Sequence, residues 1–435
     1  MSKTSKVPSS SLSRLSVFAG ITATIAGNVI KKGVKDVFSR RPVNISDLLL
    51  QEKSIRSLAD GLSHLRGAAM KIGQLLSMDA GEFLPSELTD LLNKLQANAT
   101  AMPTEQLYSV LVHNFGNEWR EKFRFFDITP FASASIGQVH LAHAKDGAVL
   151  AIKIQYPGIK SSIESDINNV ARLLRYSRLL PKHLDLVPVL DEAKKQLLDE
   201  TSYFREAESS QRYQKTLNKD NKFIIPNIFS DLSTDSILTT QYVQGQAIDK
   251  IESLDQRTKN NIVSQLIELF FEELFTYQLM QTDPNIANYL FSKAQNKLIL
   301  LDFGATREIP LTLAMNYKDL IVAVLSNDNE QIIMAATTMG FLKKNYHPTY
   351  CKHVLSLLSI TCQPLKHDTV FDFTNASLAQ EIKTISLSIN QFKDQWQQPP
   401  ADCMFIHRKI GGLYLLASKL NARINCHQLF LPHVE

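Results

Sequence analysis

The stretch Gln281-Thr282-Asp283-Pro284-Asn285-Ile286-Ala287-Asn288, with the later triplet Asp302-Phe303-Gly304, decides the fold of this chain. Asn288 follows Asp283 by five residues, and Asp302 follows it by nineteen. An apolar run directly before the triplet predicts a buried strand that ends at Asp302. Phosphoryl transfer needs one carboxylate near the attacking group, and an Asn and an Asp that hold magnesium on the phosphates. Asp283 suits the first role, and Asn288 and Asp302 suit the second.

A lysine that suits the same chemistry lies upstream. Lys153 ends the apolar run Leu150-Ala151-Ile152-Lys153, a near match to the V-A-I-K strand of protein kinases. This position predicts that Lys153 contacts the nucleotide phosphates and takes part in catalysis. A lysine buried in an apolar strand needs a charge partner, and we expect that partner to be Glu200.

The segment before this strand takes the place of the glycine-rich loop of kinases. Residues 136–141 and 149–154 predict two strands that are joined by the turn Lys145-Asp146-Gly147. Small side chains ahead of the hairpin allow backbone N–H groups to approach phosphate oxygens. Ala and Ser adopt positive φ only at a cost, so this loop should be stiffer than a glycine-rich one. The residues predicted to cover the phosphates are Ala132, Ser133, Ala134, Ser135 and Gly137.

The motif set resembles the UbiB or AarF type of atypical kinase, a family linked to ubiquinone biosynthesis. The hallmarks of that family are an alanine-rich loop and a K-x-G-Q motif, here Lys71-Ile72-Gly73-Gln74. The resemblance covers roughly residues 45–430. The segments that are similar to the branch with the mitochondrial members are 134–140, 153–158, 302–307 and 407–412.

The resemblance implies an α+β, two-lobed protein-kinase-like fold. It has a small β-containing N-lobe, a mainly helical C-lobe and a helical N-terminal extension that carries the K-x-G-Q motif. The expected parts are a basic Ser-rich tail with a membrane-surface helix, the extension, the N-lobe and the C-lobe, at residues 1–45, 46–125, 126–243 and 244–435 respectively.

The K-x-G-Q residues Lys71, Gly73 and Gln74 are expected, by the resemblance, to gate the site. The family has an E-x-D motif that meets this lysine. Here Glu200 is kept, but Ser202 stands at the Asp position. Either the clamp on Lys71 is weakened, or Glu200 carries it alone.

A strand at 237–243 stands where a kinase has its hinge. The backbone of Gln241, Tyr242 and Val243 is predicted to bind the edge of an adenine ring. Residues 256–280, which follow, are predicted to be helical up to the catalytic segment.

Charge is unevenly spread along the chain. Residues 1–45 contain eight Lys or Arg and one acid, so this segment has a charge of +7. The whole chain has a charge of +4, so the rest of the chain has about −3. Residues 16–30 carry no charge and show apolar side chains at helical spacing, directly before Lys31 and Lys32. This pattern predicts a helix that lies on a membrane surface and could also pair with a second copy. An ordinary packed helix and a mitochondrial transit peptide are the alternatives.

The expected cofactors are ATP and Mg²⁺. The expected partners are lipid or quinone intermediates, a membrane surface, and a homodimer or a quinone-biosynthesis complex. No zinc-finger spacing, RNA-binding signature or basic-aromatic stripe indicates nucleic acid. The Lys-rich N-terminal segment favours a bacterial cytoplasmic protein that is associated with the inner membrane. The alternative is a protein on the matrix side of the mitochondrial inner membrane.

The function that the resemblance implies is that of an atypical kinase or ATPase. The first hypothesis is a Mg-dependent ATP-binding ATPase that supports ubiquinone biosynthesis at a membrane. A second is a small-molecule or lipid kinase that uses Asp283 as the base toward a hydroxyl group. A third is a non-catalytic scaffold that binds nucleotide, although a scaffold has no need for both Asn288 and Asp302 as magnesium ligands.

Overall fold

The computed structural model describes 67–68, 71–72, 101–177, 187–217, 221–251, 253–283, 285–374, 377–389, 391–392 and 401–434. The predicted tail at 1–45 lies outside the described residues, and so do Gly73 and Gln74. The chain divides into two compact units. The first is Met1–Glu208 with Asn227–Tyr242, and the second is Ser209–Pro226 with Val243–Glu435.

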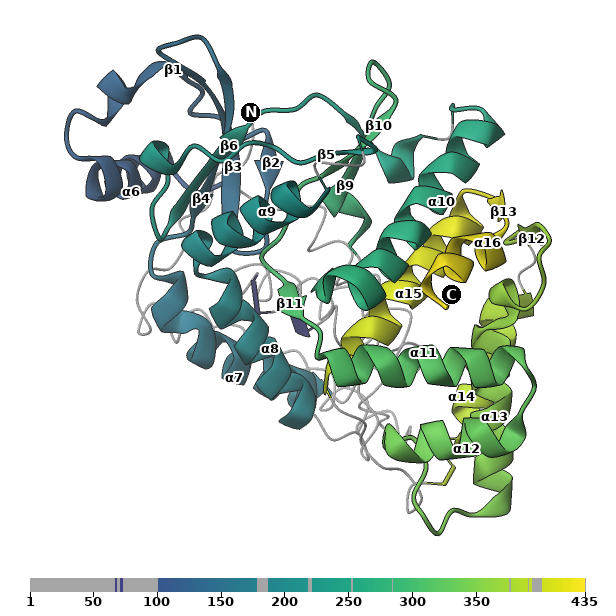
Figure 1. Ribbon diagram of the computed structural model, residues 1–435. Helices are drawn as coiled ribbons and strands as arrows, with labels where there is room; N and C mark the ends of the chain where they lie inside the picture. The colour runs from purple at the N-terminus through teal and green to yellow at the C-terminus, as the bar shows by residue number, and fades with distance from the viewer. Residues whose placement is uncertain are drawn as a thin grey trace, which may run out of the picture. The chain divides into compact units, whose positions relative to one another are not determined.

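The first unit is built on a five-stranded antiparallel sheet (Figure 1). The strands run in the order β1-β3-β4-β6, and β2 also pairs with β3. Buried and half-buried positions alternate along β3, as expected for a strand with one face in the core. The strands are β1 (Phe123–Phe126), β2 (Ala132–Ser133), β3 (Gly137–Ala144), β4 (Val149–Gln155) and β6 (Ile237–Gln241).

The predicted hairpin is present as β3 and β4. Gly147 adopts a φ of 92°, which a residue with a side chain adopts only at a cost. Its N–H donates to Ala144 O at 3.1 Å, and Ala144 N–H donates to Ala148 O at 2.9 Å. The Asp146 carboxylate also accepts from Ala148 N–H at 3.0 Å. These bonds fix the register that places Lys153 opposite Val139.

Helices complete the first unit. Helix α6 (Thr104–Phe115) buries Leu107 and Leu111 in a core that includes Trp119 and Ile152. The helices α7 (Ile159–Ser177) and α8 (Val187–Glu200) pack against one another. Helix α9 (Tyr203–Leu217) begins in this unit and ends in the second.

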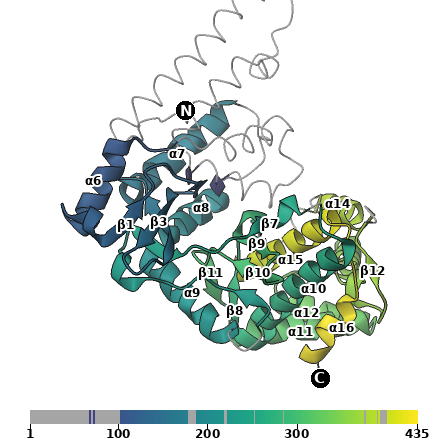
Figure 2. The same ribbon diagram turned by 90° about the horizontal axis from the view of Figure 1, so that it is seen from above.

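The second unit is mainly helical. Helix α10 lies beside α15 (Figure 2). A single large cluster of buried apolar side chains connects these helices with the small sheets of the unit. The helices are α10 (Gln256–Phe271), α11 (Leu311–Leu325), α12 (Asn329–Thr338), α13 (Pro348–Thr361), α14 (Ser377–Ile389), α15 (Ala401–Lys419) and α16 (Cys426–Phe430).

Short strands of the second unit frame the two acidic motifs. One sheet has the order β5-β10-β9-β7, and β8 pairs with β11 in another. The predicted catalytic segment connects β8 to β9, and Asp302 lies between β10 and β11. The strands are β5 (Phe223–Ile224), β7 (Gln246–Ala247), β8 (Leu279–Gln281), β9 (Tyr289–Ser292), β10 (Lys297–Leu300), β11 (Thr306–Glu308), β12 (Phe371–Asp372) and β13 (Arg423–Ile424).

The helix predicted at 256–280 has a different course. The α-helix α10 ends at Phe271, and a π-helical segment, Glu272–Tyr277, follows it. Gln278 then adopts a left-handed conformation with a φ of 51°, and strand β8 begins. The chain therefore changes direction before the catalytic segment, because the wider π-turn and the left-handed residue end the helix.

The second unit also includes residues 209–226. The sequence predicted one boundary near residue 243 and therefore placed these residues in the N-lobe. Tyr213, Leu217 and Ile225 belong to the apolar core of the second unit. Strand β5 pairs in parallel with β10 of the same unit. Core packing and strand pairing are thus the reasons for this assignment.

Among the residues that the structure describes, no helix combines the length and apolar character that a membrane span requires. The membrane-surface helix predicted within residues 16–30 lies outside the described residues. It stays a prediction.

Candidate nucleotide and phosphate site

Lys153 is held by a carboxylate of the same unit. It lies on β4, and its Nζ donates to both carboxylate oxygens of Glu206, at 2.8 and 2.9 Å. The two side chains are 16% and 6% exposed. The Nζ atom also lies 5.1 Å from the ring centre of Tyr203, within range of a cation–π contact. A lysine held in this way is oriented but still reachable by a phosphate group.

The predicted pair between Lys153 and Glu200 was wrong. Helix α8 ends at Glu200, and α9 begins at Tyr203. Glu206 therefore lies in the first turn of the second helix, within reach of β4. Glu200, at the end of α8, instead binds Lys71 and Ser135.

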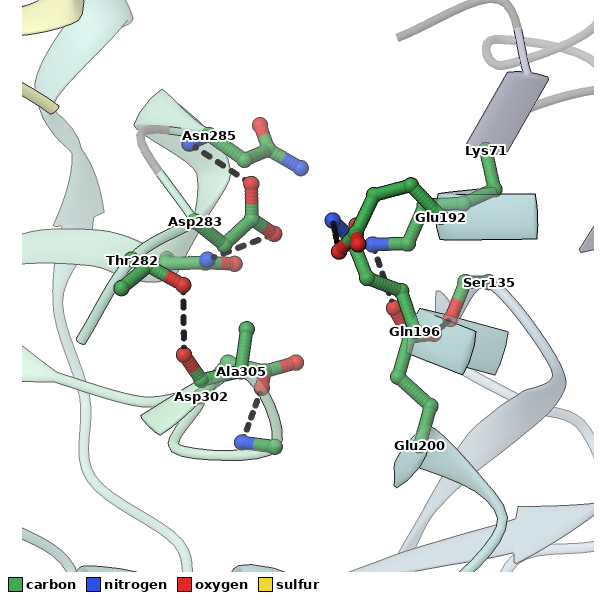
Figure 3. A network of polar contacts seen from close by, with 12 residues as sticks. Lys71, Ser135, Glu192, Gln196, Glu200, Thr282, Asp283, Asn285, Asp302 and Ala305 are labelled. Atoms are coloured by element: carbon green, nitrogen blue, oxygen red, sulfur yellow. Dashed lines mark hydrogen bonds and ion pairs between the residues drawn. The ribbon is translucent and has the colours of Figure 1, made fainter. Parts of the chain in front are cut away.

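Lys71 and Glu200 form a buried clamp, which Figure 3 shows together with Ser135. The Nζ of Lys71 lies 2.5 Å from Glu200 Oε1, and the two side chains are 4% and 15% exposed. The Ser135 hydroxyl donates to the other oxygen of Glu200 at 2.5 Å. Glu200 thus supplies a carboxylate that binds Lys71, and Ser202 lies just before α9 without an acidic group.

The alanine-rich loop is closed on itself. Ala134 N–H donates to Gly137 O at 2.9 Å, and Tyr156 N–H donates to Ile136 O at 2.9 Å. A Cβ atom at Gly137 would lie 2.3 Å from Ile154 O. Glycine is therefore required there because the neighbouring strand is close. The predicted stiffness agrees with this closed turn, although the contact with phosphate stays a prediction.

The described part of the extension lies against this loop. A Cβ atom at Gly67 would lie 3.2 Å from Ser135 O and 3.3 Å from the Ile136 side chain. Together with the bonds of Glu200 to Lys71 and Ser135, this close approach connects the extension to the loop at two points. The gating role of Lys71 remains a prediction that these contacts support.

The predicted hinge is only partly strand. Strand β6 ends at Gln241, before the predicted end at Val243. Gln241 N–H donates to Asn227 O at 2.8 Å, and Tyr242 N–H donates to Val149 O at 2.9 Å. Because these two amides donate within the protein, adenine recognition by this segment would use carbonyl groups and the amide of Val243.

The catalytic segment of the second unit is held by short-range bonds (Figure 3). The Asp283 carboxylate accepts from Asn285 N–H at 3.2 Å and from Asn288 Nδ2 at 3.3 Å. Gln281 Nε2 donates to Asp283 O at 2.9 Å. The structure thus brings Asp283 and Asn288 together, as the spacing predicted, and it fixes the direction of the carboxylate.

Asp302 lies beside this segment in the same unit. Leu301 N–H donates to Asn288 O at 3.0 Å, and the Thr282 hydroxyl donates to Ala305 O at 2.7 Å. The carboxylate of Asp302 accepts from Gly304 N–H at 2.9 Å. The two acidic motifs are therefore joined on both sides of Asp302.

The donor set of Asn288 and Asp302 fits Mg²⁺. Both line a small recess with Asp302 half-buried and Asn288 9% exposed. Since Asn288 Nδ2 donates to Asp283, the amide oxygen is the atom of that side chain that a cation would meet. Carboxylate and amide oxygens are ligands that Mg²⁺ accepts, usually with bound water and phosphate oxygens.

Glu206 is the site residue that sequence reasoning missed. It lies in the same segment as Glu200, six residues later. The signal that could have found it is the pair Thr201 and Ser202, because these residue types favour the start of a new helix. A new helix beginning there places Glu206 in its first turn.

Atypical kinases from two organisms are similar to this chain over nearly its whole length. The protein described as atypical kinase COQ8, mitochondrial, from Saccharomyces cerevisiae is 35% identical over 98% of this chain and 85% of its own length. The Danio rerio protein described as atypical kinase COQ8B, mitochondrial, is 34% identical over 99% of this chain and 69% of its own length. The match therefore extends beyond the motifs described above to nearly the whole chain.

A solved structure has the same fold. The Mycobacterium tuberculosis protein Rv3197, in its complex with erythromycin, superposes with a TM-score of 0.62 and is 24% identical. The superposition covers 88% of this chain and 97% of that chain. This similarity and the family match that follows together confirm the predicted α+β, two-lobed kinase-like fold.

Residues 94–336 match the family described as ABC1 atypical kinase-like domain. This region includes Lys153, Glu206, Asp283, Asn288 and Asp302. It covers more than half of the chain, and the relatives above match nearly all of it. The chain belongs to the ABC1 atypical kinase-like family, whose kinase-like domain binds ATP.

Proposed function

We propose that this chain is a Mg-dependent ATPase that supports the biosynthesis of ubiquinone, a lipid quinone, at a membrane. The observation that carries the proposal is the cluster of Asp283, Asn288 and Asp302, which hydrogen bonds hold together in the second unit. A protein that only binds nucleotide has no need for this complete set.

The first unit supplies the groups for the nucleotide phosphates. Lys153, held by Glu206, presents a positive charge, and the loop 132–137 covers the phosphate oxygens. The backbone of Gln241, Tyr242 and Val243 faces the adenine edge. Glu200 acts on this site through Ser135 and Lys71, so its role is to couple the loop to the extension.

The second unit supplies the groups for the reaction. Magnesium, when bound, neutralises charge on the phosphates. Asn288 and Asp302 would hold it through oxygen atoms. Asp283 accepts a hydrogen bond from the attacking water, which bonds to the terminal phosphorus as the bond from that phosphorus to ADP breaks, so that ADP and inorganic phosphate leave. Its carboxylate is already oriented by Asn285 and Asn288.

The names of the relatives bear on the location. The proteins from yeast and fish are described as mitochondrial atypical kinases. Their names support the mitochondrial alternative over a bacterial location, and the matrix side of the inner membrane is our proposal. We extend to this chain a role beside lipid or quinone intermediates, in a homodimer or a quinone-biosynthesis complex, with the basic segment 1–45 on the membrane surface.

The test is hydrolysis of Mg-ATP by the purified chain, with and without vesicles of anionic phospholipid. The variant Asp302→Asn removes the negative charge of one proposed magnesium ligand. Asp319→Asn is the matched control, because Asp319 is an exposed aspartate on helix α11 of the same unit. We expect phosphate release that rises with vesicles, vanishes in Asp302→Asn and persists in Asp319→Asn.

Labelled γ-phosphate separates the remaining functions. Label in free phosphate supports the ATPase, whereas label in an extracted lipid would favour a lipid kinase that uses Asp283 as base. Absent turnover with intact nucleotide binding would refute the proposal and favour the scaffold.

A further inference from the structure

The segment 407–412, which belongs to the family resemblance, has no role in the chemistry described so far. Its third residue, Lys409, lies on helix α15, and its Nζ forms an ion pair with Glu273 Oε2. The two side chains are 3% and 1% exposed. Glu273 comes from the π-helical segment that leads into strand β8. The pair thus connects a helix near the end of the chain to the start of the catalytic segment.

The environment of the pair makes each charge depend on the other. Burial raises the pKa of the Glu273 carboxyl, and it lowers the pKa of the Lys409 amine. A charge left alone at this depth carries a large desolvation penalty. The pair therefore has one stable arrangement, in which the Glu273 carboxylate faces Lys409.

The other oxygen of Glu273 is directed at the catalytic segment. It accepts from the Tyr213 hydroxyl at 2.8 Å and from Gln281 N–H at 3.4 Å. The Gln281 side chain, which is buried, donates to Asp283 O at 2.9 Å and accepts from the Tyr289 hydroxyl at 3.2 Å. Two hydrogen bonds, both made by Gln281, therefore lead from the ion pair to the backbone of Asp283.

A second connection leads to the Asp302 triplet. The ring of Tyr213 packs against Phe303, with ring centres 4.8 Å apart. Tyr213 is 1% exposed, and its hydroxyl also lies 3.1 Å from Leu279 O. The same small recess is lined by Glu273, Lys409, Asn288 and Asp302. The ion pair thus lies directly behind the residues assigned to magnesium.

We propose that Lys409, Glu273, Tyr213 and Gln281 are positioning residues for Asp283. The buried ion pair fixes one Glu273 oxygen, Tyr213 and the Gln281 backbone bind the other, and the Gln281 side chain sets the place of Asp283. This inference rests on the proposed function only in taking Asp283 as the catalytic carboxylate.

The test uses variants that remove single polar atoms and keep volume. Tyr213→Phe removes one hydroxyl and keeps the ring on Phe303, and Gln281→Met removes the bonds to Asp283 and Tyr289. Tyr350→Phe is the matched control. Tyr350 is also buried in this unit, and its hydroxyl donates to a backbone carbonyl, Phe341 O, at 3.4 Å.

Two quantities are measured on each full-length variant. The first is kcat and KM for Mg-ATP hydrolysis. The second is hydrogen exchange of the backbone amides at 281–289, which is slowed by bonds such as Thr282 N–H to Ala305 O. We expect kcat to fall about tenfold at unchanged KM, and exchange in this segment to rise about tenfold, since one buried hydrogen bond is lost. Tyr350→Phe should change neither quantity.

The outcomes separate this inference from the proposed function. Absent hydrolysis by the unmodified chain would refute the proposed function, while the exchange rates would still decide the positioning role. Equal exchange in Tyr213→Phe, Gln281→Met and Tyr350→Phe would overturn the inference. So would faster exchange spread over the whole second unit, because that pattern indicates general loss of stability.

Discussion

The substitution Glu206→Gln is the most direct test of the role assigned to Lys153 as the lysine that contacts the nucleotide phosphates. Gln has nearly the same shape and keeps one acceptor oxygen, but it removes the negative charge that faces Lys153 at 2.8 and 2.9 Å. A charge-assisted hydrogen bond contributes about 1.5–3 kcal/mol to stability. One acceptor is retained and Lys153 is 16% exposed. We therefore expect the free energy that holds Lys153 in its orientation to fall by roughly 1–2 kcal/mol.

This energy converts to a fall of about 5- to 30-fold in kcat/KM for Mg-ATP, because each 1.36 kcal/mol is tenfold in rate. The assay is steady-state phosphate release, with the ATP dissociation constant measured separately by calorimetry. The matched control is Glu208→Gln, since Glu208 is an exposed glutamate on the same helix, α9. It should retain the unmodified rate.

Glu200→Gln distinguishes the two carboxylates. It removes the charge opposite Lys71 and leaves Lys153 with Glu206. Glu206→Gln could have the same kcat/KM as Glu208→Gln while Glu200→Gln weakens ATP binding. That result would refute the assignment of Glu206 as the carboxylate that orients Lys153.

A further prediction concerns the alanine-rich loop. Ala134→Gly should make the turn closed by Ala134 N–H and Gly137 O easier to open, because Gly adds backbone freedom of about 0.5–1 kcal/mol. An open turn leaves the N–H of residue 134 available to a phosphate oxygen, so ATP and ADP should bind about two- to fivefold more tightly. Equal dissociation constants in calorimetry would contradict this reasoning.

Local patterns predicted the framework of the site well. The β3–β4 hairpin follows from two apolar runs and a turn that ends in Gly147, all within 137–155. The grouping of Asp283 with Asn288 follows from a short loop whose bonds span a few residues. Interactions of this range depend on neighbouring sequence alone, so spacing is sufficient to infer them.

Long-range choices could not be read from the sequence in the same way. The partner of Lys153 depends on where α8 ends, and two glutamates six residues apart satisfy the sequence pattern equally. The π-helical segment has no distinctive composition, since Glu272–Tyr277 resembles an ordinary helix. Its geometry is explained by the buried contact of Glu273 with Lys409, which lies 136 residues away.

On the proposed function, the ion pairs give the two units different kinetic roles. In the first unit, the pairs of Lys153 with Glu206 and of Lys71 with Glu200 would fix groups that meet the nucleotide. In the second, the pair of Lys409 with Glu273 would fix groups that act on the transferred phosphate. A substitution that removes a contact made equally in the ground state and the transition state changes KM or nucleotide affinity. A substitution that misplaces a catalytic carboxylate lowers kcat. Nucleotide affinity should therefore respond to changes in the first unit, and turnover at saturating ATP to changes in the second. A Tyr213→Phe variant with altered affinity and normal kcat would show that the two pairs do not divide the work in this way.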